Sequence, residues 1–251
     1  MDLIQKITKS RSLFKKYLEP EWDVSSLPDY STKEIERLYS SKLPSNSELS
    51  FGKASACNFT LNHLKIPSHK LHVIYYNFPE LNNSPLKVTK ACADKMMSLY
   101  TKEIINPEDS IILIITEPIT ENLEKAIEDT YKKGYETLLE TKLSDEIIEE
   151  NEALGDDKYT LHHFRNIHLF HIDTLSYDIG NHKLVPKHEC IRNQTEIQKI
   201  YEETNSSSDQ LPAILRTDPM AKLLRLAPGD VCKITRNSER CGEYVYYRIC
   251  Q

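Results

Sequence analysis

The stretch that decides the fold is Leu211-Pro-Ala-Ile-Leu-Arg-Thr-Asp-Pro-Met-Ala-Lys-Leu-Leu-Arg-Leu-Ala-Pro-Gly-Asp-Val-Cys-Lys-Ile-Thr-Arg-Asn-Ser-Glu-Arg-Cys-Gly-Glu-Tyr-Val-Tyr-Tyr-Arg-Ile-Cys-Gln251. Asp218 can accept hydrogen bonds from the free N–H groups of a first helical turn. Pro219 suits the first helical position because it has no N–H group to leave unsatisfied. Pro228 and Gly229 occupy the second and third positions of a type II turn. The stretch therefore predicts a capped helix, a tight turn and two strands at 231–236 and 244–249.

The same stretch resembles the assembly domain of the fifth-largest subunit of eukaryotic nuclear RNA polymerases, which has a shorter archaeal counterpart. The family pattern runs Leu-Pro, Asp-Pro-(apolar)-Ala-(basic), Gly-Leu-(basic)-x-Gly, a Val-Lys-Ile strand, Ser-Glu-x-(small)-Gly-x-Tyr and a final Tyr-Arg. The matching positions are Leu211, Pro212, Asp218, Pro219, Ala221, Lys222, Leu226, Gly229, Lys233, Ile234, Arg236, Ser238, Glu239, Gly242, Tyr244, Tyr247 and Arg248. Lys183-Leu-Val-Pro-Lys-His188 also resembles the family, which has Leu-Val-Pro-x-His at this point. The resemblance implies a divergent, non-catalytic subunit of a multisubunit DNA-directed RNA polymerase.

Length and composition are those of an ordinary globular protein. The 251 residues are 39% hydrophobic and 28% charged, which suits two domains. No apolar run approaches the roughly 18 residues of a membrane span, and Met1-Asp-Leu-Ile-Gln-Lys6 does not resemble a signal peptide. We expect no membrane association. The six cysteines, at 57, 92, 190, 232, 241 and 250, include no closely spaced pair, so we expect reduced, mostly buried thiols.

Charge is unevenly distributed along the chain. The net charge of −6 argues against strong, independent binding to nucleic acid. Between Glu121 and Asp157 there are 13 acidic and 4 basic residues. Relatives lack most of residues 132–160, so this part is an acidic insertion. We favour a solvated, partly helical surface segment; the alternative is an added contact for a basic partner.

Residues 1–172 predict an α/β domain. Residues 1–50 form a helical lead-in, in which Ser31 and Glu34 are a candidate capping box and 40–50 a loop. The expected strands are 55–61, 71–76, 110–116 and 161–172, and the expected helices 88–104 and 120–131. Alternating strands and helices predict a sheet that is covered on its faces. The resemblance implies a jaw domain with a nuclease-like sheet over 1–172 and a small α/β assembly domain over 173–251, which is α+β overall.

A catalytic or metal site is not expected. Metal-dependent nucleases need two carboxylates and a nearby lysine, and Glu108, Asp109, Glu140 and Lys142 offer such a set only superficially. Glu140 and Lys142 lie in a helix-like acidic stretch and not beside the strand that follows Asp109. His162, His163, His168 and His171 crowd one segment, but a strand would point His168 and His171 to opposite sides. We therefore assign no catalytic residue, metal or cofactor, and keep a stand-alone nuclease-like DNA-processing enzyme as the alternative.

Two surfaces are candidates for binding. Arg225, Arg236, Tyr246 and Arg248 are expected to be exposed and to contact the largest polymerase subunit, with neighbouring small subunits as further partners. Alternatively, Arg236 and Arg248 pair locally with Glu239 or Glu243. The motif residues are expected to serve the fold alone; they are Pro212, Asp218, Pro219, Gly229 and Gly242.

The second surface is the loop at the start of the helix expected from residue 120. The resemblance implies that Pro118, Thr120 and Asn122 lie near downstream double-stranded DNA, without sequence specificity. Glu117 and Glu121 weaken this expectation because they add negative charge. The implied location is the nucleus for a cellular protein, and a cytoplasmic viral factory or the virion for a large DNA virus.

Overall fold

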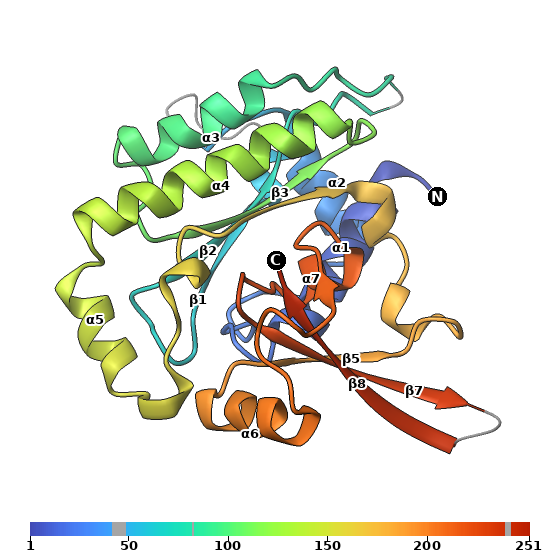
Figure 1. The fold of residues 1–251 in the computed structure, drawn as a ribbon. Helices are drawn as coiled ribbons and strands as arrows, with labels where there is room; N and C mark the ends of the chain where they lie inside the picture. Colours follow the sequence, from blue (N-terminus) through green and yellow to red (C-terminus); the bar gives the residue numbers. More distant parts are fainter. Residues whose placement is uncertain (42–48, 82, 239–241) are drawn as a thin grey trace. The chain divides into compact units, whose positions relative to one another are not determined.

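The computed structural model describes residues 1–41, 49–81, 83–238 and 242–251 (Figure 1). The chain forms two compact units. Unit 1 contains Met1–Ile147 and Phe164–Tyr177, and unit 2 contains Ile148–His163 and Asp178–Gln251. The predicted domains, 1–172 and 173–251, differ from these units chiefly at residues 148–163, which belong to the C-terminal unit.

A four-stranded sheet forms the centre of unit 1. Its order is β1 (Phe59–Asn62), β2 (Lys70–Tyr75), β3 (Ser110–Ile115) and β4 (Ile167–His171). Strand β1 is antiparallel to β2, and β2, β3 and β4 are parallel. Every residue of β3 is buried, which confirms the prediction of a strand covered on both faces.

Helices cover the two faces of this sheet. α3 (Ala91–Thr101) and α4 (Glu121–Thr141) lie side by side (Figure 1), and their apolar side chains pack on a core that includes Ile74 and Leu113. On the other face is α1 (Leu3–Leu18), whose Phe14 ring packs edge-on against Phe170 of β4 with ring centroids 5.8 Å apart. α2 (Thr32–Ser40) packs against α1 and begins with the predicted capping box of Ser31 and Glu34. The α/β class predicted for this region is confirmed.

Some predicted elements of unit 1 have different bounds. Residues Lys53–Cys57 form a 3₁₀ turn (η1), not the start of a strand. Leu161–His163 also form a 3₁₀ turn (η3), and β4 begins only at Ile167, after Arg165 with a left-handed φ of 51°. A further 3₁₀ turn, η4 (Ile172–Leu175), follows β4. The predicted helix 88–104 is shorter in the structure, and the predicted helix 120–131 continues to Thr141 because its apolar spacing persists.

Unit 2 is built on a second four-stranded sheet. Its order is β5 (Lys187–Ile191), β7 (Val231–Ser238), β8 (Gly242–Cys250) and β6 (Ala213–Ile214). β7 is antiparallel to both β5 and β8, and β6 is parallel to β8. The remaining elements are α6 (Gln194–Thr204), α7 (Pro219–Leu223) and the 3₁₀ turns η2 (Gly155–Asp157) and η5 (Ile179–Asn181). α5 (Asp145–Glu152) contains the point where unit 1 ends and unit 2 begins.

Sequence signals at the ends of these elements are confirmed. Asp218 caps α7 and accepts hydrogen bonds from the N–H groups of Met220 (2.8 Å) and Ala221 (3.3 Å), with Pro219 at the first helical position. Gly229 has φ of 94°, as the third position of a type II turn requires. The two predicted strands 231–236 and 244–249 lie within β7 and β8.

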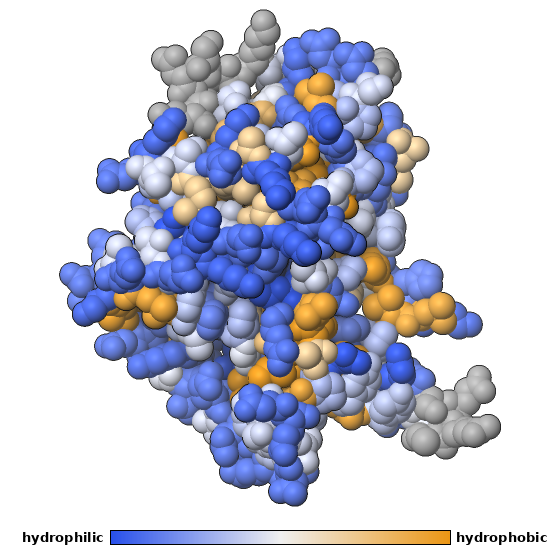
Figure 2. Space-filling model, turned by 45° about the horizontal axis from the view of Figure 1, so that its top comes forward, coloured by the Kyte–Doolittle hydropathy of each residue, from blue (hydrophilic) through white to orange (hydrophobic). Residues whose placement is uncertain are grey.

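The surface is mostly polar, and the apolar side chains on the face in Figure 2 form scattered patches. Among the described residues, no helix combines the length and apolar character needed to span a membrane. The five described cysteines are free, and burial raises the pKa of the Cys57 thiol to about 11. Cys241 and most of the predicted loop 40–50 lie outside the described residues.

Candidate partner interface

Strands β7 and β8 bring three of the predicted partner-binding residues onto one face. In their antiparallel register Arg236 lies opposite Tyr244, Ile234 opposite Tyr246, and Cys232 opposite Arg248. Side chains of a strand alternate between the two sides of a sheet, so Arg236, Tyr244, Tyr246 and Arg248 share one side. We call these four residues the ribbon face.

The ribbon face is a continuous arrangement of cations and rings. The guanidinium carbons of Arg236 and Arg248 each lie 5.9 Å from the centroid of the Tyr246 ring. The rings of Tyr244 and Tyr246 stack with centroids 6.1 Å apart and planes 26° from parallel. Tyr244 is 38% exposed and Arg236 is exposed, whereas Tyr246 and Arg248 are half-buried. The face can therefore contact another molecule through both charge and aromatic surface.

Hydrogen bonds hold the two arginines in different ways. Arg248 Nη1 donates to the carbonyl oxygen of Ala213 at 2.8 Å, which fixes this guanidinium beside β6. A hydrogen bond with the Tyr244 hydroxyl raises the pKa of the Arg236 side chain. Among the described residues neither arginine forms an ion pair with Glu243, and Glu239 lies outside them. Arg236 therefore carries an accessible positive charge.

Arg225 does not belong to this face. Only 4% of its surface is exposed, so the expectation that it is exposed is wrong. It adopts φ of 53° directly after α7, where the N–H groups of Arg225 and Leu226 donate to the carbonyls of Lys222 (3.2 Å) and Ala221 (2.9 Å). These two bonds form a Schellman motif, whose left-handed position is usually glycine. The family pattern has glycine before Leu226, and that signal indicates a backbone role for residue 225.

The motif residues occupy caps and turns. The carbonyl of Pro212 accepts a hydrogen bond from the Ile249 N–H at 2.9 Å, which joins the start of β6 to β8. Gly242 has φ of 71°, and a β-carbon built there would meet no atom within 4 Å. Gly242 is therefore required by its backbone conformation and not by lack of space. Asp230, which the sequence pattern does not single out beyond its turn, is buried at 3% exposure and contacts several elements of unit 2.

The predicted DNA-proximal residues lie at the start of α4. Thr120 is the N-cap residue, and its hydroxyl accepts a hydrogen bond from the Leu123 N–H at 3.3 Å. Pro118, Thr120 and Asn122 are all exposed. The Glu117 carboxylate accepts a hydrogen bond from the Val88 N–H, so part of its charge is used within unit 1. Contact with DNA stays a prediction.

The carboxylates of the nuclease hypothesis are engaged in the fold of unit 1. Asp109 is 1% exposed and accepts hydrogen bonds from the N–H groups of Lys70 (3.0 Å) and Asn106 (3.1 Å), and it pairs with His72 at 3.1 Å. Glu108 accepts from the Ser144 N–H at 2.8 Å. Within the described residues, no three His, Cys, Asp or Glu side chains form a group that could hold a metal ion. Nothing in this geometry supports nuclease chemistry.

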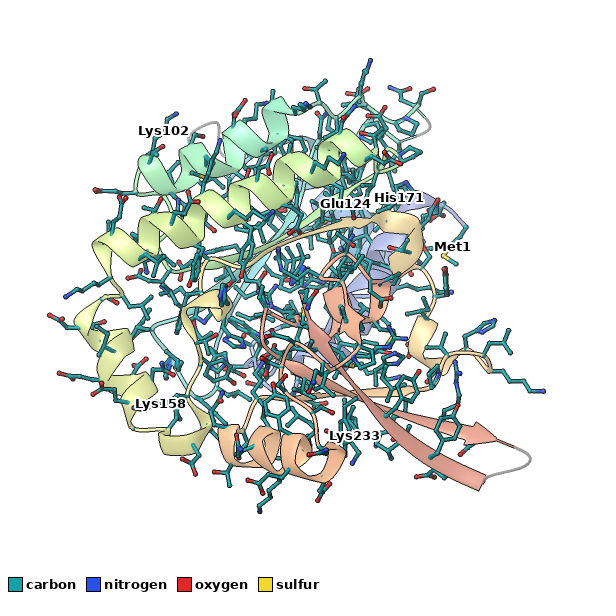
Figure 3. All side chains as sticks on the ribbon, in the orientation of Figure 1. Met1, Lys102, Glu124, Lys158, His171 and Lys233 are labelled. Carbon is teal, nitrogen blue, oxygen red and sulfur yellow. The ribbon has the colours of Figure 1, made fainter. Side chains whose placement is uncertain are left out.

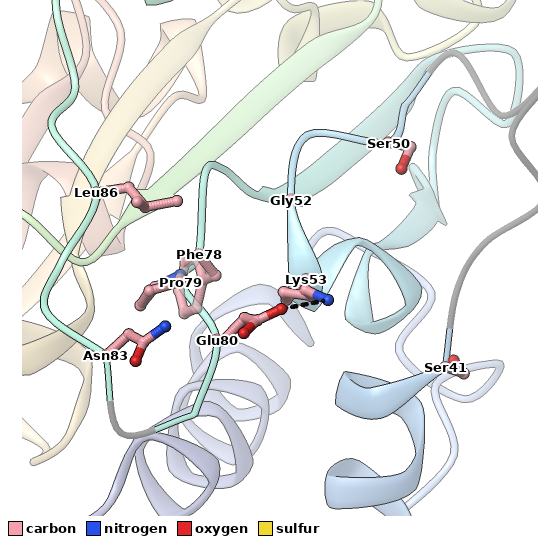
Figure 4. Close-up of a pocket in the computed structure, with 9 residues that line it drawn as sticks. All are labelled: Ser41, Ser50, Gly52, Lys53, Phe78, Pro79, Glu80, Asn83 and Leu86. Carbon is pink, nitrogen blue, oxygen red and sulfur yellow. Dashed lines mark ion pairs between the residues drawn. The ribbon is translucent and has the colours of Figure 1, made fainter.

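Unit 1 also contains a cavity of about 430 Å³ (Figure 4). An ion pair crosses one side of it, between Lys53 Nζ and Glu80 Oε1 at 2.9 Å, and both side chains are substantially exposed. Opposite charges at this distance neutralise each other, so the pair offers no net charge for a ligand. A groove of about 530 Å³ in unit 2 is lined in part by Lys183, Leu184 and Arg236.

Comparison with known proteins matches the C-terminal part of the chain. Residues 177–250 match the family model described as RNA polymerase Rpb5, C-terminal domain. The chain is 47% identical over 72 residues to DNA-directed RNA polymerase subunit Rpo5 of Methanosphaera stadtmanae, which is 29% of this chain and 92% of that protein. The chain belongs to the Rpb5/Rpo5 family of DNA-directed RNA polymerase subunits.

Further Rpo5 proteins agree with this membership. Those of Sulfolobus acidocaldarius and Sulfurisphaera tokodaii are 48% identical over 71 residues and 46% identical over 74 residues. These alignments cover 28% and 30% of this chain, and 83% and 87% of the two relatives. The Rpb5/Rpo5 resemblance expected from residues 211–248 is therefore confirmed. It covers the region that carries the ribbon face and not unit 1.

Proposed function

We propose that the chain is a non-catalytic structural subunit of a multisubunit DNA-directed RNA polymerase. The observation that carries this proposal is the match of residues 177–250 to the Rpb5 C-terminal domain, together with the exposed cations and rings of the ribbon face in the same region. Arginine and tyrosine are enriched at the energetically important positions of protein interfaces. The ribbon face anchors the chain to the largest polymerase subunit, and neighbouring small subunits complete the contact.

A charge reversal at the ribbon face tests this anchor. We expect Arg236→Glu to reduce recovery of the largest subunit with the tagged full-length chain by at least about tenfold, because interface arginines often contribute 2 kcal/mol or more. Arg248→Glu should have a similar effect, although it also removes the bond to Ala213. Lys199→Glu is the matched control, since Lys199 is exposed on α6 and the charge change is the same. Equal recovery with Arg236→Glu and Lys199→Glu would exclude the ribbon face as the anchor.

Unit 1 is proposed to act as a jaw near the downstream duplex in the assembled polymerase. The free N–H groups at the start of α4 suit a backbone phosphate, which carries no sequence information. A photo-crosslinker placed at Asn122 in a transcribing complex should react with downstream DNA, and one placed at exposed Leu139 of the same helix should not. Equal reaction at both sites, or none, contradicts this placement.

The location of the protein follows that of its polymerase in this proposal. It is the nucleus for a cellular enzyme, and a cytoplasmic viral factory or the virion for the enzyme of a large DNA virus. No observation favours the stand-alone nuclease, because Glu108 and Asp109 are engaged in hydrogen bonds of the fold.

A further inference from the structure

The carboxylate of Asp230 joins separate segments of unit 2. Its Oδ1 lies 2.9 Å from Nε2 of His163, and its Oδ2 accepts hydrogen bonds from Arg192 Nε (3.1 Å) and the Ala227 N–H (2.8 Å). His163 follows directly on the acidic insertion, and Arg192 follows β5. In Figure 3, the labels Lys158 and Lys233 mark the chain near the end of the insertion and the β7 strand that follows Asp230.

The three charged groups support one another. Burial disfavours the charge of Asp230, but Arg192 and His163 outweigh it and hold the pKa of this carboxyl at about 2. Burial also disfavours the imidazolium of His163, but Asp230 outweighs it and raises the pKa of the ring. Removal of one member of a buried ion pair is strongly destabilising because the remaining charge is left unpaired.

The segment that carries His163 is also attached to the start of α6. Asp157 Oδ1 accepts a hydrogen bond from Asn193 Nδ2 at 2.7 Å, and Asp156 Oδ2 accepts one from the Thr195 hydroxyl at 2.8 Å. Asn193 is the N-cap residue of α6, where negative charge interacts favourably with the helix dipole. Two acidic residues of the insertion therefore bind unit 2 itself.

Tyr159 occupies the space between these two attachments. Its ring meets the His163 ring edge-on, with centroids 5.2 Å apart, and the Arg192 guanidinium lies 5.7 Å from the ring centroid. Asn151 forms hydrogen bonds of 2.8 and 2.9 Å with the backbone N–H and carbonyl of Tyr159. Residues 156–163, which we call the clasp, are thus held at both ends and in the middle.

Asp230 connects the clasp to the strands of the ribbon face. It precedes Val231, the first residue of β7, and its carbonyl accepts a hydrogen bond from the Cys250 N–H at 2.8 Å. The Gly229 N–H donates to the Cys250 carbonyl at 3.1 Å. The start of β7 and the end of β8 are therefore fixed next to the carboxylate that His163 holds.

We propose that the clasp positions the ribbon face through the pairing of His163 with Asp230. His163 is a positioning residue, and the clasp contributes to the polymerase interface from inside unit 2 without touching the partner. An alignment of 72 residues covers 92% of the Methanosphaera stadtmanae relative, so that protein has too little remaining chain for a counterpart of the clasp. That the ribbon face binds a partner rests on the proposed function; the clasp itself does not.

The test compares His163→Gln with His162→Gln, the same substitution one residue earlier, in the full-length chain. Hydrogen exchange is measured over 156–163 and over 227–232, and recovery of the largest polymerase subunit is measured in parallel. We expect His163→Gln to accelerate exchange in both segments at least about tenfold and to reduce recovery, because a bond between charged groups is lost. His162→Gln should change neither. If His163→Gln does not fold, wild-type protein at pH 6 and pH 9 gives the comparison without a mutation, with exchange rates corrected for their intrinsic pH dependence.

Each contrary outcome is distinct. Faster exchange over 156–163 with unchanged exchange over 227–232 overturns the proposal, because the clasp is then an appendage. Unchanged recovery despite faster exchange in both segments also overturns it, because the clasp then does not position the face. If wild-type protein recovers no large subunit, the proposed function fails, while the exchange data still decide whether His163 closes the clasp on Asp230.

Discussion

Tyr246 lies between two guanidinium groups, and this arrangement gives the ribbon face its character. Each cation–π contact at an exposed site contributes about 0.5–1 kcal/mol, so the two contacts with Arg236 and Arg248 restrict three flexible side chains at little cost. Side chains that are already ordered lose less entropy on binding. The face is thus suited to a partner surface with carboxylates and aromatic rings.

Gly242 provides a test of backbone conformation at the start of β8. Its φ of 71° is unfavourable for a β-branched residue by about 1–2 kcal/mol, although the space for a side chain is open. We expect Gly242→Val to accelerate hydrogen exchange in β7 and β8 by about tenfold and to lower recovery of the polymerase, with unit 1 unchanged. Gly242→Asn is the control because asparagine tolerates the left-handed region. Equal effects of Val and Asn would show that side-chain bulk matters and not φ.

The clasp links short elements that local sequence would not bring together. η2 and η3 contain only three residues each, so their stability depends on contacts with α6 and Asp230. The groups that influence His163 are Asp230, Arg192 and Arg225 around it, Cys190 beside Asp230, Arg216 beside His162, and Tyr159, Thr160 and His162 of its own segment. Asp230 is the one that favours the charged ring most, so the clasp responds to pH through this pair.

The stability of the clasp should fall as pH rises. A histidine whose folded pKa is raised stabilises the fold fully below its unfolded pKa of about 6.5, and this contribution is lost as pH passes the folded pKa. Asp230 has a lowered pKa, so its contribution is present above its unfolded value and is lost as pH falls towards about 2. We expect exchange over 156–163 to be slowest between about pH 4 and pH 6 and to accelerate at higher pH, and we expect this acceleration to be absent in His163→Gln. A pH-independent wild-type protein contradicts a charged pair.

At the scale of the whole molecule, local signals predicted most elements. Ser31 and Glu34, Thr120, and Asp218 with Pro219 each mark the start of a helix where the structure has one. These signals act within a few residues, through caps whose partners are the next N–H groups. The buried strand 110–115 was predictable for a similar reason, because a continuous apolar run has few alternatives.

Features that depend on distant partners were not predictable. Leu161–His163 have the composition of a strand, but His163 pairs with Asp230, 67 residues away in sequence, and the segment turns. Arg225 looks like a surface residue until its left-handed φ and burial are known. Of the predicted partner face, Arg236, Tyr246 and Arg248 came together because strand alternation is local, and Tyr244 joined them by the same rule.

The central claim is that this chain is a structural subunit of a DNA-directed RNA polymerase, and one measurement tests it most directly. The full-length chain is tagged in its native source and purified at moderate salt, and the associated proteins are identified by mass spectrometry. The account predicts the largest polymerase subunit and the other polymerase subunits in amounts equal to that of the tagged chain. Recovery of the folded chain alone, or with proteins that are not polymerase subunits, would contradict it.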